Sequence, residues 1–130
     1  MKAEELRKLK HELRTPVNHI LGYSSLLLEN ADDSDDHITA ELARSIHTSG
    51  EMLARLLEKN LLSTSTEIDD AQMEALHESV RPVVKQILEI LSSRSAPAIV
   101  DVHANDLDRI RHAANKLLTL LTTDRVPVSD

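Results

Sequence analysis

The residues best suited to chemistry lie near the start of the chain, in the segment HELRTPVNHILGY, which covers residues 11–23. His11 is followed directly by Glu12. An imidazole is nucleophilic at neutral pH because its pKa is about 6.5. A carboxylate that accepts the N–H of one ring nitrogen fixes the tautomer and makes the other nitrogen a better nucleophile. The pair therefore predicts nucleophilic chemistry at His11, with Glu12 as its nearest acidic partner.

Pro16 follows one turn after this pair, inside a stretch that otherwise has helical spacing. Proline has no N–H to donate to the carbonyl of Glu12, and its ring crowds that carbonyl, so we expect the helix to bend there. Such a residue costs roughly 3 kcal/mol in an ordinary helix. Two interpretations stay open: a bend that lets a partner approach His11, and a kink tolerated for packing.

Four segments must position these residues, and each has apolar residues at the three-four spacing of an amphipathic helix. The expected helices run from about 3 to 30, from a cap at Asp35 or Asp36 to 62, from 67 to 93, and from 104 to 122. His11 stands two residues from Leu9 and from Leu13, both on the apolar stripe. Two residues turn a helix by about 200°. His11 is therefore expected to face solvent.

The composition agrees with an all-helical chain. Among 130 residues, 41% are hydrophobic, but only 2 are glycine and Tyr23 is the single aromatic residue. Too few glycines are present for the tight turns of a sandwich or barrel, so we expect an all-α protein of one domain. Four helices joined by short loops predict an antiparallel four-helix bundle over residues 1–130.

Charge and motif patterns exclude several kinds of partner. The net charge of −7 argues against nucleic acid and anionic membrane surfaces. No cysteine is present, and Thr15 occupies the last position of an H-E-x-x-H pattern, so we expect no metal site; His37 and His103 are expected to be solvated at helix starts. No segment predicts membrane insertion or a signal peptide, so a cytoplasmic location is expected.

The chain also shows an internal repeat, which predicts two helical hairpins, residues 1–62 and 67–122, packed as one bundle. At one constant offset, His11, Glu12 and Pro16 match His77, Glu78 and Pro82. At an offset one residue shorter, Leu42, Arg44 and His47 match Leu107, Arg109 and His112. The apolar stripes of the first and third helices align slightly better at an offset one residue longer than the one that matches His11 with His77. A chance match between helices is the alternative.

The segment HELRTPVNHILGY resembles the H-box of histidine kinases, the motif of their dimerisation and histidine phosphotransfer domain. The pattern is His-Glu-x-x-Thr-Pro, then Asn18 two residues after the proline and Gly22 four further on. The resemblance covers residues 5–62 as a hairpin. It implies a catalytic group of His11, Glu12, Thr15 and Asn18. In this group His11 is the phosphoacceptor and Glu12 its acid/base partner, and Thr15 positions water for the dephosphorylation of a response regulator.

The same resemblance implies a partner. A receiver domain would dock on a face made by part of the second helix and by His19, Gly22, Tyr23 and Leu26. The receiver would bring its own Mg²⁺, so no cofactor is expected in this chain. In the family two hairpins from two chains form one bundle, so tandem hairpins predict a monomeric pseudo-dimer rather than a homodimer.

The second copy departs from the motif. HESVRP keeps His77 and Glu78, but Arg81 stands where threonine is expected and Val84 stands where the first copy has Asn18. His77 is therefore a possible second phosphoacceptor, paired with Glu78. The alternative is a relic on a solvated helix face.

The function that follows is histidine phosphotransfer, in which His11 exchanges a phosphoryl group with a receiver aspartate. No autonomous kinase activity is expected, because two glycines cannot build a Gly-rich nucleotide lid and no P-loop is present. One alternative is the dimerisation and phosphoacceptor core of a histidine kinase, served by a separate ATP-binding domain. Another is a purely structural signalling bundle.

Overall fold

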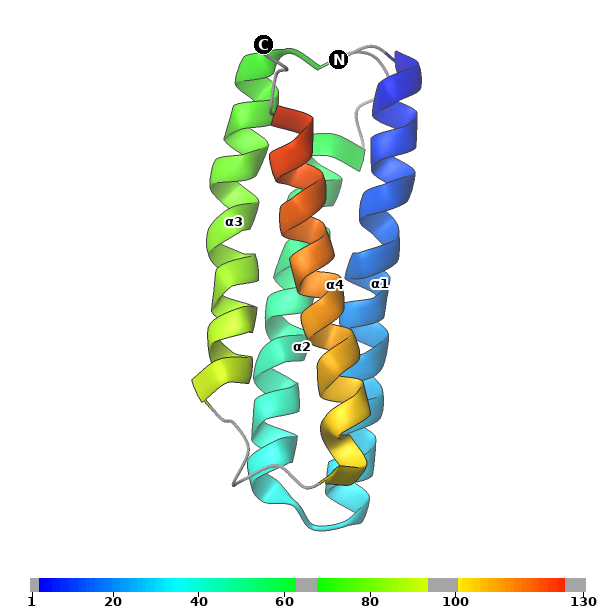
Figure 1. Cartoon of the computed structure of the whole chain (residues 1–130), viewed down its shortest axis with the longest axis vertical. Helices are drawn as coiled ribbons and strands as arrows, with labels where there is room; N and C mark the ends of the chain where they lie inside the picture. Colours follow the sequence, from blue (N-terminus) through cyan, green and yellow to red (C-terminus); the bar gives the residue numbers. More distant parts are fainter. Residues whose placement is uncertain (1–2, 63–67, 94–100, 126–130) are drawn as a thin grey trace.

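A computed structural model describes residues 3–62, 68–93 and 101–125 as a four-helix bundle (Figure 1). The elements are α1 (Ala3–Asp33), α2 (His37–Leu57), the π-helical turn η1 (Glu58–Leu62), α3 (Asp70–Ser93) and α4 (Asp101–Arg125). The helices run antiparallel in sequence order. α1 packs against α2 and α4, and α3 packs against the same two helices, so α1 and α3 lie across the bundle from each other. The predicted all-α bundle is confirmed.

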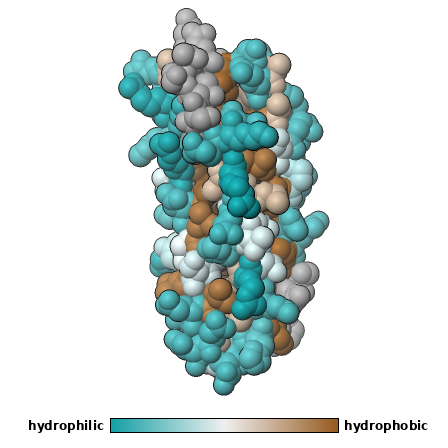
Figure 2. Space-filling view, turned by 180° about the vertical axis from the view of Figure 1, so that it is seen from behind, coloured by the Kyte–Doolittle hydropathy of each residue, from teal (hydrophilic) through white to brown (hydrophobic). Residues whose placement is uncertain are grey.

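Each helix contributes one apolar stripe to a single aliphatic core. On α1 the largest fully buried side chains recur every seven residues, as expected where helices pack along their length; they are Leu6, Leu13, Ile20 and Leu27. The face seen from behind is mostly hydrophilic, with hydrophobic residues showing between polar ones (Figure 2). No helix in the described ranges is both long enough and apolar enough to cross a membrane.

Gly50 sets the closest approach of α2 to α1. A Cβ atom at this position would lie 3.1 Å from Ile20 Cγ2 and 3.1 Å from Leu21 Cδ2. Any larger side chain would push the two helices apart or displace these two residues. Gly22 has no such constraint, because a Cβ there would meet nothing within 4 Å. The two glycines therefore differ in role: Gly50 permits packing and Gly22 leaves surface open.

The turn between α1 and α2 settles which aspartate caps the second helix. Asp35 has a positive φ of 59°, a conformation that aspartate tolerates better than most residues. Asp36 is the N-cap: its Oδ1 accepts from the backbone N–H of Thr39 at 3.1 Å, and its Oδ2 accepts from the Thr39 hydroxyl at 2.7 Å. These two hydrogen bonds, helped by the nearby His103, hold the pKa of Asp36 below its ordinary value of 3.8.

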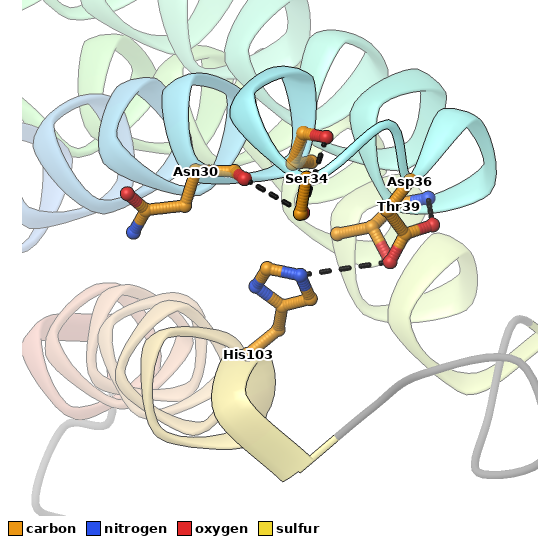
Figure 3. Close-up of polar contacts among 6 residues, drawn as sticks. Asn30, Ser34, Asp36, Thr39 and His103 are labelled. Carbon is orange, nitrogen blue, oxygen red and sulfur yellow. Dashed lines mark hydrogen bonds and ion pairs between the residues drawn. The ribbon is translucent and has the colours of Figure 1, made fainter.

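His103 lies against this turn, which corrects the expectation that it is solvated. Its ring is only 2% exposed, and Nε2 lies 3.5 Å from Asp36 Oδ2. Figure 3 shows the imidazole pointing from the first turn of α4 toward the α1–α2 turn. The expectation was wrong because α4 begins three residues earlier than its apolar spacing indicates, at Asp101, so that His103 packs inside the end of the bundle.

Replacing Asp36 by alanine is expected to lower the free energy of unfolding by about 1 kcal/mol, the usual cost of losing an N-cap. The folded-state pKa of Asp36 is lowered, so its stabilisation is fully present above the unfolded pKa near 3.8. That stabilisation disappears as the pH falls through the lowered folded pKa. Urea unfolding at pH 7 and in strongly acidic buffer measures both values.

Asp36→Asn is the control, because asparagine caps helices well but carries no charge. It should keep most of the stability at pH 7 and lose the pH dependence that comes from this position. An alanine variant as stable as the parent at pH 7 would contradict the capping role.

The third helix begins with a reciprocal cap. Gln72 N–H donates to Asp69 Oδ1, and Asp69 N–H donates to Gln72 Oε1, both at 2.8 Å. This is a capping box with glutamine in the third helical position. The sequence from Thr66 to Asp69 also has the pattern of a capping signal, but Thr66 lies outside the described residues. α3 starts at Asp70, three residues later than expected.

The buried positions of the two hairpins correspond, but not in the register given by the matched histidines. Buried residues of α1 and α3 correspond at the longer offset; the pairs are Leu6 and Met73, Leu9 and Leu76, Leu13 and Val80, Val17 and Val84, and Ile20 and Ile87. α2 and α4 correspond at an offset one residue shorter than expected; the pairs include Ala43 and Leu107, Ile46 and Ile110, and Leu53 and Leu117. The predicted matches of His11 with His77 and of His47 with His112 therefore each differ by one residue from the match that burial gives.

Candidate functional site

The H-box residues lie along one solvent-facing side of α1. His11, Glu12, Thr15 and Asn18 are all exposed, as their distance from the apolar stripe predicts. Pro16 differs, because its ring is buried although α1 continues through it from Ala3 to Asp33. The helix therefore accepts the proline within its packed side, one turn after the exposed histidine.

A cavity of about 330 Å³ opens between α1 and α4 and joins these residues. Its α1 side is lined by His11, Glu12, Thr15, Pro16 and His19. Its α4 side is lined by His112, Ala113 and Lys116. We call this space the His11 groove. Asn18 is exposed on α1 but does not line it.

Sequence reasoning missed the α4 side of this groove. In the sequence His112 is marked only by its match with His47, and Lys116 is one charge on a polar face. The signal that finds them is the antiparallel packing of α1 against α4, which brings the middle of α4 beside the H-box.

The residues that the resemblance implies for receiver docking continue along α1 below the groove. The His19 and Tyr23 rings meet edge to face, with centroids 5.8 Å apart and planes at 65°. Arg109 of α4 donates from Nη1 to the Tyr23 hydroxyl at 2.9 Å, and its guanidinium carbon lies 5.3 Å from the ring centroid. This hydrogen bond raises the pKa of Arg109 above its ordinary range. Tyr23 thus ties α1 to α4, while Gly22 and Leu26 remain exposed.

The second H-box is placed differently, which corrects the expectation of a solvated His77. The His77 ring is 1% exposed, whereas Glu78 and Pro82 are exposed. In the register set by burial, His77 takes the place of Lys10, and Glu78 takes the outward place of His11. One residue turns a helix by about 100°, which is enough to move the imidazole from the surface into the bundle. A receiver domain therefore has no access to His77 in this structure.

The groove has mixed charge. Glu12 brings a carboxylate, Lys116 an ammonium group, and three imidazoles lie along the same space. Within the described parts of the chain, no three His, Cys, Asp or Glu side chains are grouped so that they could hold a metal ion. An exposed nucleophile beside a carboxylate, opposite a cation, is suited to receiving and releasing an anionic group.

Known proteins resemble the chain in the region of this site. The family profile for the His Kinase A (phospho-acceptor) domain matches residues 1–68. Histidine kinase 3 of Arabidopsis thaliana is 27% identical over 109 residues, which are 84% of this chain and 10% of that protein. Sensor histidine kinase AruS of Pseudomonas aeruginosa is 32% identical over 94 residues, 72% of this chain and 9% of that protein.

The circadian input-output histidine kinase CikA of Synechococcus elongatus is also 32% identical over 94 residues, 72% of this chain and 12% of that protein. The chain thus spans about a tenth of the length of these relatives. No solved structure matches it significantly. The profile match over half of the chain, which includes the exposed H-box of α1, shows that the chain belongs to the His Kinase A family of phosphoacceptor and dimerisation domains in two-component signalling.

Proposed function

We propose that this chain is a histidine phosphotransfer module in which His11 exchanges a phosphoryl group with an aspartate of a receiver domain. The observation that carries the proposal is the exposure of His11 beside Glu12, in a groove wide enough to admit a phosphoryl group. The family membership supports a two-component partner of this kind. Mg²⁺ would come with the receiver domain.

The chemistry follows from the two adjacent residues. Glu12 accepts the N–H of one ring nitrogen of His11, which leaves a lone pair on the other nitrogen. That lone pair forms the N–P bond as the P–O bond of the aspartyl phosphate breaks, and the aspartate leaves as a carboxylate. The reverse step returns the phosphoryl group, because the N–P bond is labile. Thr15 lines the same groove and would position water when the receiver is dephosphorylated.

We further propose that the two hairpins form a pseudo-dimer within one chain. The corresponding burial of α1 with α3 and of α2 with α4 supports this arrangement, as does the diagonal placement of α1 and α3. A single hairpin would expose its apolar stripe. Two tethered hairpins bury each other's stripes without a second chain.

A second candidate function is the phosphoacceptor core of a histidine kinase that a separate ATP-binding domain phosphorylates. Two relatives favour it, because Histidine kinase 3 and sensor histidine kinase AruS carry that name and the matched part of this chain spans only about a tenth of each. The two functions share His11 and differ in the phosphoryl donor. A purely structural bundle is a weaker candidate, because the intact H-box lies exposed rather than packed away.

The test mixes the chain with a phosphorylated receiver domain that carries a radioactive phosphoryl group. Phosphotransfer predicts label on this chain that is stable in base and lost in acid, as a phosphoramidate bond requires. Adding an isolated histidine-kinase ATP-binding domain with ATP tests the second candidate in parallel. Label from that domain alone, and none from any receiver, would favour the kinase core.

The chain alone is expected to take up no label from ATP and magnesium. Its sequence contains no P-loop and no Gly-rich segment to hold the β- and γ-phosphates. Labelling is measured beside His11→Gln, which shows how much of any label is on His11, and on parent purified by two independent routes, which exposes a contaminating kinase. Stoichiometric labelling of the parent, absent from this control, would show that the prediction is wrong.

A further inference from the structure

The His11 groove is completed by a helix that the family profile does not cover. The profile matches residues 1–68, whereas Lys116 and His112 lie on α4. Both are exposed, and both line the same cavity as His11. The second hairpin therefore does more than bury the apolar stripe of the first, because it forms one wall of the groove.

The charge balance in this groove gives Lys116 a role. A phosphoryl group on His11 brings close to two negative charges into a space that already contains the Glu12 carboxylate. Like charges at short range disfavour that state. Among the described residues that line the groove, Lys116 is the one lysine or arginine. An ammonium group with three N–H donors is a common partner of phosphate oxygens.

The corresponding groove on the other side of the bundle offers an internal comparison. A cavity of about 580 Å³ lies between α2 and α3, and its lining includes Thr48, Gln86 and Ile90. In the register set by burial these three occupy the places of His112, His19 and Tyr23.

The register also places Glu78 where His11 stands and Met52 where Lys116 stands. The exposed histidine and the lysine thus occur together on the α1–α4 side, and both are replaced at the corresponding positions of α3 and α2. That joint occurrence is what an acceptor and its anion-binding partner would show. The α2–α3 cavity itself overlaps only part of the corresponding space, and its lining includes Arg44.

We propose that Lys116, with His112 beside it, binds the phosphoryl group that His11 receives. The inference rests on the proposed function and adds a binding residue to it. The Lys116 ammonium group donates to the phosphoryl oxygens while the N–P bond forms and the P–O bond of the aspartyl phosphate breaks. Lys116 itself forms and breaks no covalent bond. Charge spreads over these oxygens during transfer, so a cation held nearby speeds the step.

The experiment compares Lys116→Met, which keeps an apolar stem without the charge, with Lys116→Arg and the parent. Lys85→Met is the matched control, because Lys85 is an exposed lysine on α3 that lies outside the groove. Two donors are used: potassium phosphoramidate, a small molecule that phosphorylates histidine, and a phosphorylated receiver domain. The rate of labelling at His11 is obtained by subtracting the labelling rate of His11→Gln from that of each variant.

Lys116→Met is expected to label about tenfold more slowly with either donor, the effect of losing one charge-assisted contact. Lys116→Arg should restore most of the rate, and Lys85→Met should match the parent. Parental rates in Lys116→Met, or equal slowing in Lys85→Met, would overturn the inference.

The two proposals fail in different ways. If the parent reacts with phosphoramidate at His11 but with no phosphorylated receiver, the relay function fails, and the phosphoramidate rates still decide the role of Lys116. If the receiver labels His11 at the same rate in the parent and in Lys116→Met, the relay stands and the Lys116 inference falls. Thermal unfolding followed by circular dichroism shows that each variant is folded.

Discussion

Replacing His11 by glutamine is expected to abolish the transfer of label from a phosphorylated receiver domain to this chain. Glutamine is polar and similar in length, and position 11 is exposed, so the fold should be unaffected. Its amide nitrogen has no free lone pair with which to attack phosphorus. The measurement is the acid-labile, base-stable label on His11→Gln beside that on the parent.

His77→Gln is the matched control, since it removes the histidine that the sequence repeat aligns with His11. The ring of His77 is 1% exposed, so a receiver cannot reach it and the folded variant should keep parental labelling. Glu12→Gln should fall between the two, with labelling slower by about a hundredfold, because general-base assistance is lost while the nucleophile remains. Equal label on His11→Gln and the parent would show that the assignment of His11 is wrong.

The second large effect concerns assembly. At micromolar concentration the chain is expected to sediment as a monomer, and its midpoint of unfolding should not change with protein concentration. The apolar stripes of all four described helices already meet in one core, so little hydrophobic surface is left for a partner copy. Sedimentation equilibrium and urea unfolding at several concentrations measure both properties.

Two other assemblies are distinguishable. The first is pairing of two bundles through leucines at the edges of the stripes, but Leu57 is 1% exposed, and Leu28 and Leu120 are partly buried against the core. Exchange of hairpins between two chains remains the competing arrangement. A dimer whose unfolding midpoint rises with concentration would show that the tandem hairpins do not complete one another.

Much of the fold could be predicted because a helix is formed by interactions between residues that are close in the sequence. The three-four spacing of leucine and isoleucine marks each apolar stripe, and Asp36 was one of two residues expected to cap α2. The register between the two hairpins could not be predicted from matched residues, because burial follows the apolar stripe. His77, like His11, is followed in sequence by a glutamate and, five residues later, by a proline. Burial of Leu76 and Val80 nevertheless fixes the rotation of α3 and turns the His77 imidazole inward.

The candidate site was predictable on one side only. His11, Glu12 and Thr15 belong to a local motif whose exposure follows from its distance to Leu9 and Leu13. The opposite wall depends on which helix packs beside α1, and no local pattern contains that information. Lys116 is therefore identified as a groove residue only from the packing of α4 along α1 (Figure 1).

The outward position of Glu78 changes how much signal one bundle can store. A symmetric pair of H-boxes has an empty, a half-filled and a full state, and its output can depend on the second site as well as the first. Here one H-box histidine faces outward and its counterpart is a carboxylate, which is unable to form an N–P bond. With His11 as the proposed acceptor, the bundle is expected to behave as a two-state memory: it would saturate at one phosphoryl group per chain, without cooperativity, and its output would scale with the number of chains.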